Sequence, residues 1–156
     1  MIRTSGAALS SKSPIAYVDI RAFAHATEDT EKVLAAIRNV LPTESVDSVV
    51  FEKSNLDGYY GNPITLLETR IKDRNVAQAV FGKLASCLSL LDKELLSNEI
   101  MQHLDKGSLY LRIDKQSAYL KQFRLGSTDA IHFRMHFKKS NPEEVIETCR
   151  KFGLLP

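Results

Sequence analysis

The sequence lacks most of the short motifs that enzymes and metal proteins use. It has two cysteines in 156 residues, no CxxC pair and no cluster of histidines, so we expect no structural zinc site. The GxxxxGK(S/T), GxGxxG, HExxH and GxSxG motifs are also missing. We therefore predict a protein that is not an enzyme and that has no metal or cofactor. A catalytic site assembled from residues far apart in the sequence would leave no such motif and stays open.

Long apolar runs are missing too. No uncharged stretch approaches the 18 or so residues that a membrane span needs, so we expect no membrane association. Residues 1–14 are small and rich in serine, and their apolar run Gly6–Leu9 is shorter than the core of a signal peptide. We predict a flexible tail over residues 1–14 and, from two cysteines without a signal peptide, a cytoplasmic location.

The composition of the chain is that of a folded globular protein. Hydrophobic residues make up 44% of the chain and charged residues 26%, with a net charge of +2. A chain of this length can bury about 68 to 70% of its unfolded surface, so it needs neither a disulfide nor a metal to fold. We predict one domain over residues 15–156.

Residues 109–139 show the most regular pattern in the chain. Segments 109–116, 117–125 and 130–139 alternate apolar with polar residues, which predicts three half-buried strands. In the last segment Ile131, Phe133, Met135 and Phe137 share one face, and the opposite face carries His132, Arg134, His136 and Lys138.

Positive charge is concentrated in the same region. Residues 106–139 contain eight Lys or Arg against two Asp, so this region has an excess of six positive charges and the remainder of the chain carries −4. The two patterns together predict a sheet with one apolar face and one cationic face.

The rest of the chain supplies further strands and the helices. Strands are expected at residues 15–26, 46–55 and 64–72. Helices are expected after Thr27 as N-cap, after Asp73 through residue 91 with a continuation or restart at Asp92 through residue 104, and after Asn141. The helix after Asp73 would bury Cys87 beside Leu84, Leu88 and Leu91 as an apolar, structural thiol. The resulting order, β-α-β-β-α-β-β-β-α, predicts an α+β fold whose mostly antiparallel sheet has helices packed on one face.

An uncovered basic sheet face has three interpretations. Lys and Arg can neutralise RNA phosphates, and Tyr17, Phe23 and Tyr110, with Tyr59 and Tyr60 on a loop, could stack on bases. The same face could instead contact a protein partner or a second copy of the chain, or it could simply be solvated. The RNP1 pattern of RNA-recognition motifs is absent, so that domain is not indicated.

Three patches together resemble one archaeal family. They are His25-Ala26-Thr27-Glu28-Asp29, Gly58-Tyr59-Tyr60-Gly61-Asn62-Pro63 and Tyr110-Leu111-Arg112-Ile113-Asp114-Lys115-Gln116. Their order and spacing are similar to those of small archaeal proteins described as predicted RNA-binding proteins or exosome subunits. That family resembles in fold the large-subunit ribosomal protein that binds 5S ribosomal RNA.

The resemblance implies a non-catalytic role with RNA, with exosome or other RNA-processing proteins as possible partners and a homodimer through the sheet face as the alternative. Among the matching positions, the local sequence favours an architectural role, in a cap or a turn, for Thr27, Gly58, Gly61 and Asn62. The residues that we predict to contact RNA are Arg21, His25, Tyr60, Asn62, Tyr110, Arg112, Lys115, His132, Arg134, His136 and Lys138.

Overall fold

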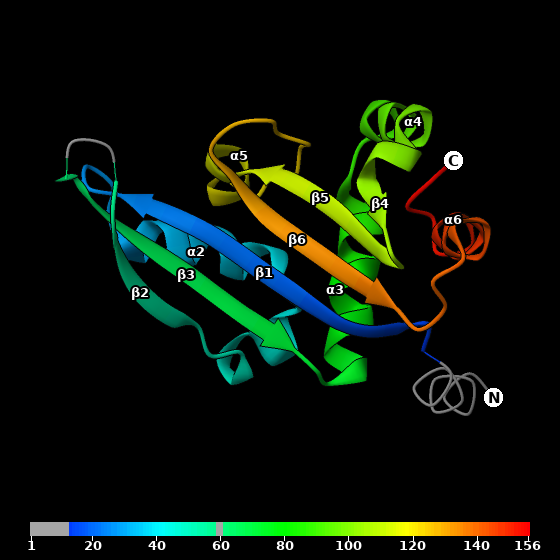
Figure 1. Ribbon diagram of the computed structural model, residues 1–156, viewed down its shortest axis with the longest axis horizontal. Helices are drawn as coiled ribbons and strands as arrows, with labels where there is room; N and C mark the ends of the chain where they lie inside the picture. The colour runs from blue at the N-terminus through cyan, green and yellow to red at the C-terminus, as the bar shows by residue number, and fades with distance from the viewer. Residues whose placement is uncertain (1–12, 59–60) are drawn as a thin grey trace.

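The computed structural model describes residues 13–58 and 61–156, so most of the predicted tail lies outside the described residues. One six-stranded sheet organises the rest (Figure 1). In chain order the elements are β1 (Ile15–His25), α2 (Thr30–Val40), the 3-10 helix η1 (Thr43–Ser48), β2 (Glu52–Asp57), β3 (Pro63–Ile71), α3 (Arg74–Cys87), α4 (Leu90–Asn98), the 3-10 helix η3 (Ile100–His103), β4 (Leu104–Asp105), β5 (Ser108–Asp114), α5 (Lys115–Tyr119), β6 (Ala130–Phe137) and α6 (Pro142–Lys151).

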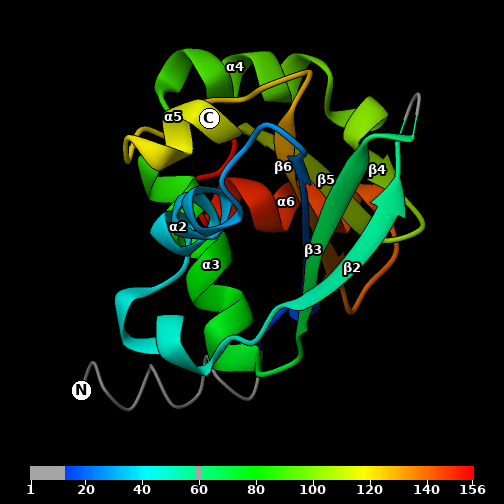
Figure 2. The same ribbon diagram turned by 90° about the vertical axis from the view of Figure 1, so that its left-hand side faces the viewer.

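The strand order in the sheet is β2-β3-β1-β6-β5-β4, and every neighbouring pair is antiparallel. The first strand therefore lies at the centre, and the last strand inserts between β1 and β5. Helices α2 and α3 lie on the same side of the sheet and leave the other side uncovered (Figure 2). The predicted α+β class, with helices on one face of an antiparallel sheet, is confirmed.

The core lies between the sheet and these helices. Val18, Ile20, Ala22 and Ala24 of β1 are buried, as the alternation predicts, and so are Ile131, Phe133, Met135 and Phe137 of β6. Helix α3 contributes Phe81, which is fully buried. The Phe81 ring meets Phe137 of the sheet edge-on at 5.8 Å between ring centroids and Phe152 after α6 at 5.3 Å.

Side-chain caps set the helix starts. Asp73 accepts hydrogen bonds from the backbone N–H groups of Asn75 and Val76, and Asn141 accepts one from Glu143, as predicted. Thr27 was the wrong residue for the cap of α2. Asp29 takes that place, because its carboxylate accepts from the N–H of Glu31 at 2.9 Å.

The predicted strand over residues 117–125 is wrong. The Asp114 carboxylate accepts from both the N–H and the hydroxyl of Ser117, at 2.9 and 2.7 Å, and this cap starts α5 instead. Ala118 and Phe123 are buried, so the apolar side chains of this segment pack in the core without forming a strand.

The sheet has a short strand that the sequence did not predict, β4, which joins β5 through a turn with positive φ at Lys106 (50°) and Gly107 (84°). That turn replaces the helix end predicted there.

Two further expectations need correction. Residues 46–48 belong to η1, so the second strand starts at Glu52. Helix α3 buries Ala77, Val80, Phe81, Leu84 and Ala85 and ends at Cys87, where Ser89 caps the separate helix α4. Cys87 is the last residue of α3 and Leu91 lies in α4, and both are exposed, so the predicted burial of these two side chains is wrong. The other cysteine, Cys149, is buried.

Within the described residues, no helix is long and apolar enough to cross a lipid bilayer.

Candidate nucleic-acid interface

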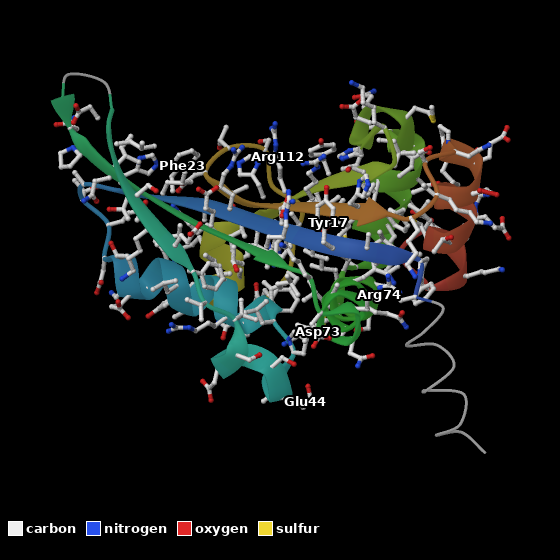
Figure 3. The ribbon with its side chains drawn as sticks, turned by 60° about the horizontal axis from the view of Figure 1, so that its bottom comes forward. Tyr17, Phe23, Glu44, Asp73, Arg74 and Arg112 are labelled. Carbon is white, nitrogen blue, oxygen red and sulfur yellow. The ribbon has the colours of Figure 1, made fainter. Side chains whose placement is uncertain are left out.

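The uncovered face of the sheet carries the outward residues of five strands. Figure 3 shows Tyr17, Phe23 and Arg112 on this side, and Glu44, Asp73 and Arg74 on the side of the helices. The strand register aligns these outward residues into rows that run across the sheet. We call this surface the open face.

A groove of about 1150 Å³ runs over the open face. Its floor comes from β1, β3, β5 and β6, and Glu52 of β2 lies on one side. The opposite wall comes from the end of α4, η3 and residues 125–127. Two hydrogen bonds fix this wall: the Leu125 N–H donates to the Asp92 carboxylate at 3.1 Å, and the Gly126 N–H donates to the Arg112 carbonyl at 2.8 Å.

Gly126 is required by a close approach of backbones. A Cβ atom at this position would lie 3.0 Å from the Cα of Asp114. The absence of a side chain therefore lets the 125–127 wall lie directly against β5.

In one row of the open face a central Asp pairs with an arginine on each side and offsets one of the two positive charges. This row consists of Arg70, Asp19, Arg134 and Tyr110, on β3, β1, β6 and β5. The Asp19 carboxylate accepts two hydrogen bonds from Arg70, at 2.7 and 3.0 Å, and lies 3.7 Å from the Arg134 guanidinium. The hydrogen bond from Arg70 raises the pKa of that guanidinium above its usual value, so Arg70 stays charged. We call these four residues the neutralised row.

The next row is cationic. Arg112 on β5 is the register partner of His132 on β6, which is in turn the partner of Arg21 on β1. Burial lowers the pKa of His132, and the charges of Arg21 and Arg112 lower it further. Within the described residues neither arginine has an ion-pair partner, and Arg112 donates one hydrogen bond to the Ser127 carbonyl at 3.3 Å. We call Arg112, His132 and Arg21 the cationic row.

The aromatic side chains of the open face differ in their freedom to stack. Tyr17 lies between the His136 ring, at 4.9 Å between centroids, and the Arg70 guanidinium, 4.1 Å from its ring centre. Because both of its faces are covered, Tyr17 is poorly placed to stack on a base. Tyr110 is 39% exposed, and the Arg134 guanidinium lies 5.8 Å from its ring centre. Phe23 is half-buried beside Arg21.

A buried serine orients two of the predicted residues. The Ser108 hydroxyl accepts from Arg134 Nε at 3.1 Å and lies 2.9 Å from His136 Nδ1. Since Arg134 Nε can only donate, the Ser108 hydroxyl can in turn donate a hydrogen bond to His136 Nδ1. Ser108 is fully buried, so this set of hydrogen bonds positions Arg134 and His136 on the open face.

Lys115 lies away from this face, although it is among the residues that the resemblance predicts to contact RNA. Its side chain is 7% exposed, and Nζ lies 2.9 Å from the Glu28 carboxylate, 2.7 Å from that of Asp129 and 2.9 Å from the Phe23 carbonyl. It does not line the groove. Two of the family-like patches, residues 25–29 and 110–116, thus meet in an ion-pair cluster, and this placement indicates a structural role for Lys115.

His25 belongs to the same cluster, with Nε2 at 3.4 Å from Asp129. His25, Glu28 and Asp129 offer ligand atoms within 4.8 Å of one another, which is a spacing that a metal ion could use. The ammonium group of Lys115 already takes both carboxylates as partners. A divalent cation there would have to overcome the repulsion from that charge, so we describe the cluster as an ion-pair network.

The remaining predicted residues are not gathered in the groove. Tyr60 lies outside the described residues. Asn62 is exposed in the β2–β3 turn, where its carbonyl accepts from the Gly58 N–H at 2.7 Å, and Lys138 is exposed just beyond β6. The residues predicted to contact RNA did not include Asp19, Glu68 or Arg70, whose outward positions on strands β1 and β3 follow from the same alternation. These residues make the open face mixed in charge. Within the described residues, the arginines of the cationic row that form no ion pair are Arg21 on β1 and Arg112 on β5.

Fold and groove together define a small α+β protein with an uncovered sheet face that presents guanidinium, imidazole and aromatic groups. Residues 17–137 match the model of a family described as RNA binding. The chain is 36% identical over 140 residues to RNA-binding protein PAB1135 from Pyrococcus abyssi, a match that covers 86% of this chain and 91% of that protein. It is also 32% identical to the uncharacterized protein MJ0213 from Methanocaldococcus jannaschii, over 83% of this chain and 92% of that one.

A solved structure agrees with these sequence matches. Protein AF2318 from Archaeglobus fulgidus superimposes with a TM-score of 0.75 and 30% identity, over 88% of this chain and 99% of that one. The chain therefore belongs to this RNA-binding family, and the archaeal resemblance drawn from its three patches is confirmed.

Proposed function

We propose that the protein binds RNA without modifying it and that the groove on the open face is the binding surface. The observation that carries the proposal is the cationic row, which places in the floor of an accessible groove two arginines that form no ion pair within the described residues. Guanidinium groups match phosphate geometry and release counterions when they bind RNA. The family membership supports RNA as the ligand.

Aromatic contacts complete the proposed surface. Tyr110 lines the groove and Phe23 lies on the open face beside Arg21, and both are at least partly exposed for stacking with unpaired bases. Stacking contributes about 1 to 3 kcal/mol for each base. Since a stacked base must first be unpaired, this arrangement favours single-stranded or looped RNA over a regular duplex.

The test is a binding titration of the full chain with a labelled single-stranded RNA and a labelled hairpin. We expect weak binding whose affinity falls steeply with salt, with a log–log slope of about −2 for three phosphate contacts on a single strand. Arg112→Ala and Arg134→Ala should each weaken binding, and Arg112→Ala should make the salt dependence shallower. Arg74→Ala removes the same charge from an exposed site on the helix side and is the matched control. Binding that ignores salt, or equal losses in all three variants, would refute the proposed surface.

The same face could instead be covered by a second copy of the chain. The dimer interface would then bury three aromatic side chains that are partly exposed in the monomer, namely Tyr17, Phe23 and Tyr110. Light scattering on the purified protein separates the two hypotheses, because a dimer that protects these rings would favour self-association, and a monomer that leaves them exposed would favour RNA.

Association with the exosome or with other RNA-processing proteins in the cytoplasm is a further part of the hypothesis, and its support is the family resemblance. A pull-down from native extract tests it. Partners that remain after nuclease treatment would be bound by the protein itself, whereas partners that disappear would be held through RNA.

A further inference from the structure

The cationic row is an unusual feature of this sheet. Directly opposed residues on antiparallel strands have Cβ atoms about 4.5 to 5.5 Å apart, so Arg112 and Arg21 flank His132 on both sides. Glu68 is the register partner of Arg21 on the next strand, yet within the described residues it forms no ion pair with Arg21. Three basic side chains therefore share one stretch of the groove floor.

Neighbouring positions show that the fold can neutralise such charge. In the neutralised row, one Asp at the centre satisfies an arginine on each side. In the cationic row the position between the two arginines is His132, and burial together with their charges disfavours its protonated form. An anion bound above His132 would offset the charges of the arginines on either side.

We propose that Arg21, His132 and Arg112 bind one phosphate group of the RNA, and that His132 takes up a proton when the phosphate binds. The inference deepens the proposed function and rests on it. The two guanidinium groups would donate hydrogen bonds to phosphate oxygens from either side, and the protonated imidazole would donate a third from below. A phosphodiester within the chain and a terminal phosphate monoester share this chemistry, and the monoester carries the larger charge to match three cations.

The sign of the pH dependence follows from the surroundings of His132. Arg112 faces it from β5 and Arg21 from β1, with Arg134 two residues along its own strand. The other charged or titratable groups that line the same groove are Asp19, Glu52, Glu68, Arg70 and Tyr110, with Glu99 and His103 in the wall. In the free protein, burial and the two arginines keep the pKa of His132 below 6.5. A bound phosphate favours the charged ring, so RNA affinity should rise as the pH falls, by about tenfold between about pH 8 and about pH 5.5.

The first experiment follows the His132 ring by NMR during pH titrations of the full chain. Sulfate is the probe, because it stays a dianion throughout, and chloride at equal ionic strength is the reference. We expect sulfate to raise the pKa of His132 in the wild type and in Arg74→Gln, and to raise it much less in Arg21→Gln and Arg112→Gln. No response to sulfate, or an equal response in all four proteins, would overturn the site.

The second experiment measures RNA affinity against pH for the wild type, His132→Gln and His25→Gln, at constant ionic strength; His25 is exposed and lies outside the groove. The wild type and His25→Gln should show the tenfold change, and His132→Gln should lose most of it. An oligouridylate with a 5′-phosphate that binds more tightly than its 5′-hydroxyl form would place a terminal phosphate at the site, and equal affinities would place an internal one there.

These two experiments separate the failure of the inference from that of the proposed function. RNA binding with the expected salt dependence but with the same pH profile in His132→Gln would overturn the phosphate site and leave the function standing. A response to sulfate in a protein that binds no RNA would overturn the function, and with it RNA as the source of the phosphate.

Discussion

Lys115→Met replaces a buried ammonium group with an uncharged side chain of similar length. The wild-type amine contacts two carboxylates at 2.7 and 2.9 Å and a backbone carbonyl at 2.9 Å, which ties together the β1–α2 turn, the start of α5 and the turn before β6. Removing one partner of a buried ion pair typically costs 3 to 5 kcal/mol. The carboxylates of Glu28 and Asp129 are 29% and 54% exposed, so water can solvate them in the variant and the loss should be smaller.

We therefore expect Lys115→Met to lower the free energy of unfolding by about 2 to 3 kcal/mol, or the melting temperature by about 4 to 12 °C. Chemical denaturation followed by circular dichroism measures the change. Lys72→Met, at an exposed lysine, is the control and should change stability by less than about 0.5 kcal/mol. A loss from Lys115→Met no larger than the control would show that the cluster does not stabilise the fold.

The same variant distinguishes a structural role from a binding role. Lys115 lies outside the groove, so the folded fraction of Lys115→Met should bind RNA within about twofold of the wild type. A loss of affinity equal to that of Arg112→Ala would restore the interpretation of Lys115 as an RNA contact.

Three further predictions concern the core, the thiols and the pH dependence of stability. Phe81→Ala should destabilise the fold by about 3 to 5 kcal/mol in denaturation, because Phe81 is fully buried between Phe137 and the C-terminal segment; a loss under 1 kcal/mol would contradict the packing. Exposed Cys87 should react quickly with a disulfide reagent in the native protein, whereas burial raises the pKa of Cys149 to about 12 and should keep it unreactive until unfolding; two fast thiols would be inconsistent with this. The pKa of His132 is lowered in the folded state, so the unfolded chain binds more protons than the folded chain as the pH falls below about 6.5. The free energy of unfolding should therefore decrease with falling pH more in the wild type than in His132→Gln. Parallel plots of unfolding free energy against pH for the two proteins would argue against the lowered pKa.

Local patterns in the sequence were sufficient to predict the fold class and the open face. Strict alternation in residues 131–137 fixed which side chains of β6 point away from the helices, and the same rule placed Arg112 with Tyr110. The strand prediction for segment 117–125 was wrong because apolar and polar residues alternate there as they do in a strand. The Asp114 cap and the burial of Ala118 and Phe123 outweighed that pattern, and both depend on neighbours outside the segment.

The electrostatics of the site could not be predicted, because they depend on pairings across the sheet. Asp19 neutralises Arg70, 51 residues away in the sequence, and the Glu28 partner of Lys115 is 87 residues distant. An excess of basic residues in one region therefore did not show which of them lack an acidic partner. The groove wall formed by η3 and residues 125–127 likewise follows from tertiary contacts.

The most direct measurement of the central claim is an NMR titration of the full chain with single-stranded RNA, followed through the backbone and arginine side-chain signals. We expect the largest shifts at Arg21, Arg112 and His132, with little change on α2 and α3. Shifts concentrated on the helices, or on the Lys115 cluster, with the open face unchanged would contradict RNA binding in the groove.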